Sequence, residues 1–294
     1  MSVLSRPQGT PDRVWSLVAG LTALGGEADR ETFDRLLNPG FQRDGILVQA
    51  SPKLAGDGPG AATALGLVDS DRREVRSADG LPIGDMSDFA DLIHDRLCGV
   101  AVGDTNAVVL DAYAWVAAES DRVGGLGWIY DVGREEFADL ANAALIGEDD
   151  DGRMMNSTKV PAWRRWLRFM GLGQPMPEIL DYPSPATRIA IELRRSGSCG
   201  TTLDSASFLR IVAARCPYLD GGRLFSQACR RIGHTPSETR LSPLLSGALR
   251  DLHDERSITL HLAGDSTGAV LLAAEPTHPI GSFTSVEIAA ETAS

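Results

Sequence analysis

Lysine and cysteine are both scarce in this 294-residue chain, which has only Lys53 and Lys159 among its 28 basic residues. Its four cysteines form no C-x-x-C pair, and they are too few for the disulfide-rich class of secreted domains. We therefore expect reduced thiols in a cytoplasmic protein. No uninterrupted apolar run approaches the roughly 20 residues of a membrane-spanning helix, so we expect no membrane partner.

Motifs that carry catalysis or cofactor binding are also missing. The sequence has no G-x-x-x-x-G-K phosphate loop, no G-x-G-x-x-G after a predicted strand and no H-E-x-x-H pair. The five histidines are scattered and share no zinc-type spacing with the cysteines. We therefore expect a protein without catalytic residues, metal or cofactor.

The spacing of three residues argues instead for a nuclease site. Asp181, Glu192 and Arg194 follow the order in which a restriction-type nuclease places an Asp before a strand bearing Glu-x-Lys. Arginine is a poor substitute for that lysine, because its pKa is too high for proton transfer. We interpret the spacing as incidental.

Charge is unevenly distributed along the chain. The net charge of −12 argues against the whole chain coating nucleic acid. However, residues 153–256 carry 16 basic side chains against 9 acidic ones. An electrostatic footprint for DNA would lie in this segment.

Hydrophobic periodicity changes within residues 241–273. In "LSPLLSGALRDLHDER" apolar residues recur at helical spacing, with Ser242 as the predicted cap and a proline in the first turn. In "SITLHLA" the period becomes two, "GDSTG" predicts a turn, and "AVLLAA" is the expected returning strand. Two helices precede this unit, in "DSASFLRIVAARC" with Asp204 as the predicted cap and in "GRLFSQACRRIG". The sequence therefore predicts three helices and a hairpin, which is the order of a winged helix.

The amino-terminal segment predicts the same order. A helix begins near Pro11 and stops at Gly25-Gly26, a second follows Asp29, and a short third follows "GDGPG". The stretch "LVDSDRREVRSA" can then form a polar hairpin. We predict a mainly α fold with short β-hairpins, in which tandem winged-helix (helix-turn-helix) domains flank a helical middle region. The predicted parts are a winged helix at 1–80, a helical region at 81–184, a winged helix at 185–275 and a flexible tail at 276–294.

Arginines on the predicted helices are the candidate contacts to DNA phosphates. The candidates, which lie on the predicted helices "PAWRRWLRFMG", "GRLFSQACRRIG" and "LSPLLSGALRDLHDER", are Arg164, Arg165, Arg168, Arg230, Arg231 and Arg250. The third helix of the carboxyl-terminal unit, which a winged helix would insert into the major groove, has acidic residues around it. Docking of another protein is therefore an equally good hypothesis. Trp163 fits the apolar stripe of its helix, whereas Trp166 could be core or could stack on bases.

The segments "ALGLV", "WRRWLRFMGLG" and "LSPLLSGALRDLHDERSITL" together resemble the DpdG-like family. These are accessory proteins of bacterial islands that insert deazaguanine bases into DNA and restrict unmodified DNA. The resemblance implies a bacterial antiviral-defence role within a restriction–modification system, without catalysis by this chain. It supplies no functional residues.

The leading hypothesis is therefore a non-enzymatic winged-helix component that binds double-stranded DNA, other proteins of the same defence system, or both. A winged-helix transcriptional regulator and a purely protein-binding adaptor are the alternatives.

Overall fold

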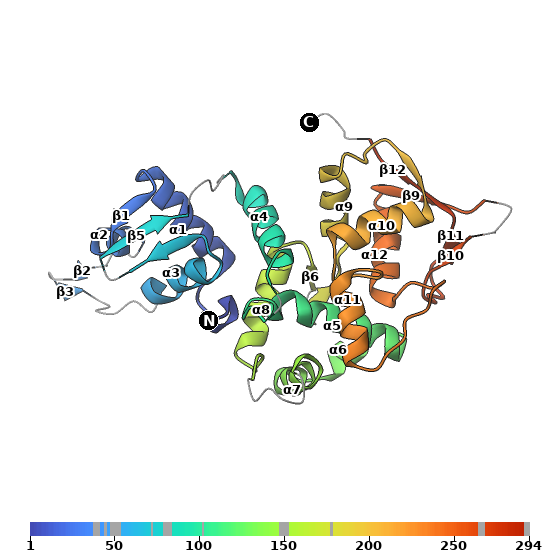
Figure 1. Ribbon diagram of the computed structural model, residues 1–294, viewed down its shortest axis with the longest axis horizontal. Helices are drawn as coiled ribbons and strands as arrows, with labels where there is room; N and C mark the ends of the chain where they lie inside the picture. Colours follow the sequence, from blue (N-terminus) through green and yellow to red (C-terminus); the bar gives the residue numbers. More distant parts are fainter. Residues whose placement is uncertain are drawn as a thin grey trace. The chain divides into compact units, whose positions relative to one another are not determined.

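The computed structural model of the chain is mainly helical, with short antiparallel strands (Figure 1). It describes residues 1–37, 42–43, 46–47, 54–71, 73–78, 84–101, 103–146, 153–176, 179–263 and 268–290. The chain divides into two compact units: unit 1 comprises Met1–Val109 with Ser157–Met170, and unit 2 comprises Leu110–Asn156 with Gly171–Ser294. Within the described residues, no helix has the length and apolar character needed to cross a bilayer.

Unit 1 begins with the predicted helices. Its elements are η1 (Val3–Ser5), α1 (Pro11–Ala23), β1 (Glu27–Asp29), α2 (Arg30–Leu37), β2 (Gln42–Arg43), β3 (Ile46–Leu47), α3 (Leu54–Ala64), β4 (Val68–Ser70), β5 (Glu74–Ser77), α4 (Met86–Cys98) and α8 (Lys159–Phe169). The α1 helix starts at Pro11, as predicted, and the chain leaves it through Gly25 and Gly26, whose φ angles of 94° and 92° suit glycine. The Asp29 carboxylate accepts the Thr32 N–H at 3.0 Å and so caps α2.

The hairpin predicted at 67–78 is confirmed as β4 and β5, but it belongs to a larger sheet. The strand β1 pairs with β5, which gives the order β1-β5-β4 with antiparallel pairing throughout. We did not predict β1, because its three residues, Glu-Ala-Asp, show no apolar alternation. The α3 helix also begins earlier than predicted and contains "GDGPG" instead of following it.

Two middle helices, α4 and α8, belong to unit 1. Asp85 caps α4, since its carboxylate accepts the N–H groups of Ser87 and Asp88. In α8, Trp163 is buried as predicted and donates from Nε1 to the Val109 carbonyl at 2.9 Å. Trp166 is only 1% exposed, so it is a core residue and not a platform for bases.

Unit 2 holds the remaining elements. They are α5 (Val108–Val123), which crosses from unit 1, then α6 (Trp128–Asp131), α7 (Arg134–Leu145), β6 (Gly173–Met176), β7 (Ile179–Pro183), α9 (Ala186–Arg195), β8 (Thr202–Asp204), α10 (Ser205–Arg215), α11 (Arg223–Arg231), α12 (Pro243–Asp254), β9 (Ile258–His261), β10 (Val270–Leu271), β11 (Ser282–Phe283) and β12 (Ser285–Ile288). The α5 helix is buried along most of its length, so it forms part of the core of this unit.

The predicted α12 and its cap are confirmed. Ser242 accepts the Leu245 N–H at 3.3 Å, and Pro243 occupies the first turn. The leucines of the helical stripe are buried, as their spacing predicted; they are Leu241, Leu244, Leu245, Leu249 and Leu252. The two preceding helices, α10 and α11, also match the predicted segments, and Asp204 caps α10 by accepting the Ser207 N–H at 2.9 Å.

The strand that returns beside β9 is not the predicted one. We expected "AVLLAA" at 269–274, but β9 pairs with β12, in the register Ile258↔Ile288 to His261↔Ser285. The short β10 pairs with β11 instead. Most of the "GDSTG" turn, residues 264–267, lies outside the described residues.

The prediction of a loosely attached tail from Pro276 is wrong for residues 282–288. The strand β12 lies at the centre of the sheet β8-β12-β9, where Val286 is fully buried and Ile288 is 3% exposed (Figure 1). Its four residues, Ser-Val-Glu-Ile, do alternate, but a segment this short among polar residues gives a weak signal.

The three-stranded sheets of the two units share one order. In each, a helix precedes a short strand, an aspartate at the end of that strand caps the next helix, and a later helix leads into the second strand. The third strand then lies between the first two, in the orders β1-β5-β4 and β8-β12-β9.

Candidate nucleic-acid interface

The three candidate arginines of α8 differ in exposure. Arg164 is 7% exposed, and Arg165 is half-buried and donates from Nη2 to the Pro7 carbonyl at 2.7 Å. Arg168 is exposed. The apolar stripe of α8 fills the core more broadly than its spacing suggested, so only Arg168 stands where a phosphate could reach it.

The two candidate arginines of α11 are neighbours at its carboxyl end. Both are exposed, and Arg231 Nη1 also lies 3.4 Å from the Asp111 carboxylate of α5. Burial raises the pKa of Asp111, and the adjacent Arg231 guanidinium partly offsets that effect. Arg231 therefore helps to hold α11 against α5.

Arg250 of α12 is not exposed as expected. It is 7% exposed, and its guanidinium donates to the carbonyls of Ala273 at 2.8 Å and Ile280 at 3.1 and 3.2 Å. Burial lowers its pKa. In this arrangement the side chain binds the chain's own carbonyls and is not exposed as expected, and its contact with phosphate stays a prediction.

Further arginines of unit 2 are more accessible. Arg210 and Arg215 on α10, Arg223 and Arg230 on α11 are all exposed. Guanidinium groups on rigid helices can donate to phosphate oxygens without selecting a base sequence. The candidates of α8 and those of α10 and α11 belong to different units, so they are two separate sets.

The outer face of α12 is covered by residues 270–283, which we call the strap. It comprises β10, the connection that follows and β11. The Ala273 N–H donates to Ser246 Oγ at 2.8 Å, and Arg250 binds both limbs of the strap through Ala273 and Ile280. The backbone of Leu271 bonds to the 239–241 segment at 2.8 and 2.9 Å. The polar residues that the sequence assigned to solvent therefore lie beneath the chain itself.

The corresponding helix of unit 1, α3, is covered from the other end of the chain. The Gln8 N–H donates to Asp57 at 3.0 Å, and Arg6 lies 3.9 Å from the same carboxylate. A Cβ on Gly9 would stand 2.5 Å from Ala61 Cβ, so the amino-terminal segment packs directly on α3. The α3 helix also contains no basic residue.

The amino terminus of α12 is fixed by a carboxylate. Asp220 accepts both the N–H and the hydroxyl of Ser242, each at 2.6 Å. Part of the residue reaches solvent, but its carboxylate is desolvated, and this raises the pKa of Asp220 although the Ser242 bonds lower it. Ser242 thus serves as a cap that is itself held in place.

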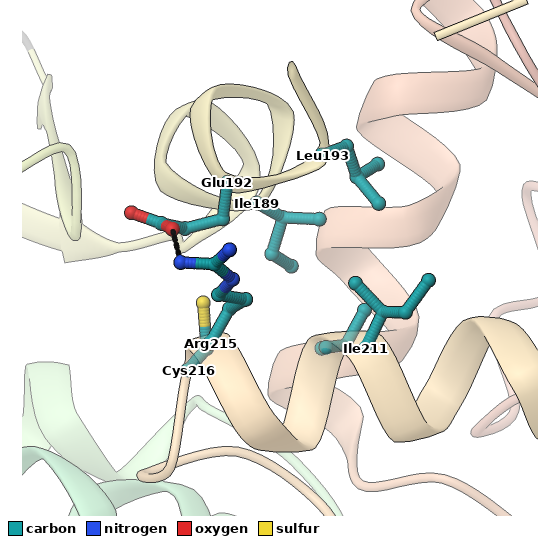
Figure 2. A pocket seen from close by; sticks show the side chains of 7 residues that line it. Ile189, Glu192, Leu193, Ile211, Arg215 and Cys216 are labelled. Carbon is teal, nitrogen blue, oxygen red and sulfur yellow. Dashed lines mark ion pairs between the residues drawn. The ribbon is translucent and has the colours of Figure 1, made fainter. Parts of the chain in front are cut away.

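Glu192 lies on a helix and not on a strand. It is 2% exposed within α9, where Arg188 and Arg195 donate to its Oε1 at 3.2 and 2.7 Å. Arg215 lies 4.0 Å from Oε2 across a shallow depression with no room for a water molecule (Figure 2). A restriction-type site needs its Glu on a strand beside the Asp, so the spacing of Asp181, Glu192 and Arg194 is coincidental.

The neighbouring thiol shows no sign of activation. Cys216 at the end of α10 is buried, and burial raises its pKa to about 12. A nucleophilic cysteine requires the opposite shift. The depression is therefore part of the packing between α9 and α10.

Sequence reasoning missed the residues that close the outer faces of α3 and α12. Gly9 and Asp57 lie about 50 positions apart, and the strap begins within the predicted returning strand and continues about ten residues past it. One signal was present: Ser246 and Arg250 are polar residues in an otherwise leucine-rich helix. Their polarity alone does not distinguish a solvated face from one bonded to main chain.

Comparison with known proteins identifies one family. The model of the DpdG-like family matches residues 1–266. Neither the curated proteins nor the solved structures contain a significant match. Since the matched region covers most of the chain, this protein belongs to the DpdG-like family.

Proposed function

We propose that this chain is a non-catalytic accessory component of a bacterial system that modifies DNA with deazaguanine bases and restricts unmodified DNA. It acts by docking other proteins of that system and, while the outer faces of α3 and α12 are covered, does not read a base sequence. Membership of the DpdG-like family supports the association with such a system. We interpret the two sheet-containing units as winged helices, and their shared strand order supports that interpretation.

The covered outer faces of α3 and α12 carry this proposal. A winged helix that reads DNA inserts the helix before its second strand into the major groove. Here that helix is covered by residues 2–9 in unit 1 and by the strap in unit 2. A transcriptional regulator would need such a helix to be exposed, so the geometry favours an adaptor.

Co-purification tests the proposal directly. The tagged chain is co-expressed with the proteins encoded beside it and washed at raised salt. We expect at least one of them to be retained, because docking through shape and apolar contact withstands salt better than phosphate contact does. Loss of every co-expressed protein under these conditions would contradict the proposal.

Sequence-independent contact with the DNA backbone is the second candidate. The exposed arginines of α10 and α11 favour it, and each phosphate neutralised contributes about −0.9 to the slope of log affinity against log salt. The double variant Arg210→Glu, Arg230→Glu should reduce that slope by about 2. Arg122→Glu reverses the charge of an exposed residue on α5; it is the control and should leave the slope unchanged.

A further inference from the structure

The face of α12 beneath the strap is polar. Ser246 is fully buried, Arg250 is 7% exposed, and Gly247 lies between them. The opposite face carries the buried leucines, including Leu245 and Leu249. A helix face that is buried permanently is normally apolar, because buried polar groups must be compensated one by one. The residues of this helix face that bond to the strap, Ser246 and Arg250, are therefore ones that water can solvate.

The strap buries few apolar side chains of its own. Within residues 270–283 only Leu272 and Phe283 are buried, and the residues 274–277 are all exposed. Its attachment is mainly through hydrogen bonds, which water can replace on opening. Segments with few buried apolar contacts open locally at a lower free energy than the global unfolding free energy. The strap can therefore detach while β9 and β12 stay paired.

The guanidinium of Arg250 makes the closed arrangement costly. Its hydrogen-bond partners are main-chain carbonyls, and the charge of Glu275 in the strap offsets only part of the desolvation that lowers the pKa of Arg250. Burying a charge that is only partly compensated carries a desolvation cost. Opening of the strap returns this cation to water, which lowers the net cost of opening.

The uncovered face has the chemistry of a groove-binding helix. Ser246 and Gly247 are small enough for the helix to approach bases closely, and Arg250 would be the cation that contacts a base edge or phosphate. A peptide partner is less well matched, because the face offers no apolar pocket for a side chain. Asp251 and Asp254, both exposed, weaken DNA binding, and the strap itself contacts Asp254, whose carboxylate lies 3.3 Å from His278 Nε2.

We propose that the strap is an intramolecular cover that competes with duplex DNA for the outer face of α12. The closed chain does not read DNA with this helix, and detachment of the strap enables it to do so. This inference goes beyond the docking function and does not depend on it. A chain that retains partner proteins could fail the DNA-binding test below, and a chain that passes that test could fail to retain partners.

Two substitutions open the strap without removing the cation. Ala273→Pro deletes the N–H that bonds to Ser246, and Ser246→Ala deletes the acceptor. Each should speed hydrogen exchange in residues 270–283 while β9 remains protected, and should tighten binding of a mixed-sequence duplex about tenfold, because the competent fraction rises. Adding Arg250→Ala to either variant should abolish the gain. Ser226→Ala, on α11, is the matched serine control and should behave as wild type.

Several results would overturn the proposal. Faster exchange in the strap with unchanged DNA affinity would show that the uncovered face does not bind DNA. A gain that survives Arg250→Ala, or tighter binding of proteins with no change for DNA, would also overturn it. Unchanged exchange in both variants would show that these bonds do not hold the strap.

The wild-type chain provides a test that needs no variant. Because linkage is reciprocal, saturating duplex DNA at low salt should speed exchange in residues 270–283 and slow it in α12. Equal exchange in the strap with and without DNA would contradict competition, even if the variants fail to fold.

Discussion

The two sheets of this protein have the same strand order but differ in one connection. In unit 1 the second and third strands, β4 and β5, are joined by residues 71–73. In unit 2 the equivalent strands, β9 and β12, are joined by residues 262–284, which contain β10 and β11. The additional length of the second connection forms the strap over α12.

The difference shows that the outer faces of α3 and α12 are covered in two different ways. The short hairpin of unit 1 cannot reach back over α3, and there the residues that precede α1 cover the helix. In unit 2 the long connection covers α12. In both units the helix that a winged helix would insert into DNA lies under the chain itself, which is why we favour docking of proteins.

The largest effect is expected at the central strand of unit 2. Val286→Asp should destabilise the chain by more than about 4 kcal/mol, because it places a carboxylate in a fully buried position. Urea denaturation followed by circular dichroism measures the loss. The exposed neighbour is the control, since Glu287→Ala should change the free energy of unfolding by less than about 0.5 kcal/mol. A wild-type midpoint for Val286→Asp would mean that residues 285–288 are not part of the core.

The cover over α3 is tested by adding one methyl group. Gly9→Ala would place a Cβ 2.5 Å from Ala61 Cβ and 2.7 Å from the Asp57 carbonyl oxygen, so we expect a loss of about 2 kcal/mol. Gly20→Ala, in the middle of α1 with no atom within 4 Å, should instead increase stability by about 0.5 kcal/mol or more. A neutral Gly9→Ala would indicate that residues 2–9 do not pack on α3.

The shared order of the two units is tested at its matched caps. Asp29→Ala and Asp204→Ala each remove a carboxylate that accepts an N–H three residues later, at 3.0 and 2.9 Å. We expect similar decreases in the urea midpoint, smaller than that of Gly9→Ala. If only one substitution lowers the midpoint, the two strand-to-helix junctions are not equivalent.

The smallest effect concerns the dependence of stability on pH. Burial raises the pKa of Asp220 above that of an ordinary aspartate, so the folded chain binds this proton at a higher pH than the unfolded chain does. Stability from this group is therefore lost as the pH rises from the ordinary pKa of the unfolded chain through the raised pKa of the folded chain. Asp220→Asn should remove this pH dependence, so its stability relative to wild type should improve between mildly acidic and neutral pH. A pH-independent difference between the two proteins would contradict the shift.

The sequence was sufficient where the signal was local. The caps at Asp29, Asp204 and Ser242 and the leucine stripe of α12 were predicted, because a cap or a stripe depends on residues three or four positions apart. The partner of β9 was not predicted, because "AVLLAA" is nearer and more apolar than the strand that actually returns.

The candidate site was predicted less well, for a related reason. Helical spacing identifies which arginines lie opposite an apolar stripe, but it does not show what packs on that opposite face. Arg230 and Arg168 are exposed as expected, whereas Arg250 and Arg164 are buried by segments distant in the sequence or by a wider core. Long-range packing overrides the local pattern at these positions.

Selection from a library of random duplexes tests the central claim most directly. The wild-type chain is incubated with the library at physiological salt, and the retained DNA is sequenced. Because both potential reading helices are covered, no base sequence should be enriched over the input. Enrichment of a defined sequence by the wild-type chain would contradict this account.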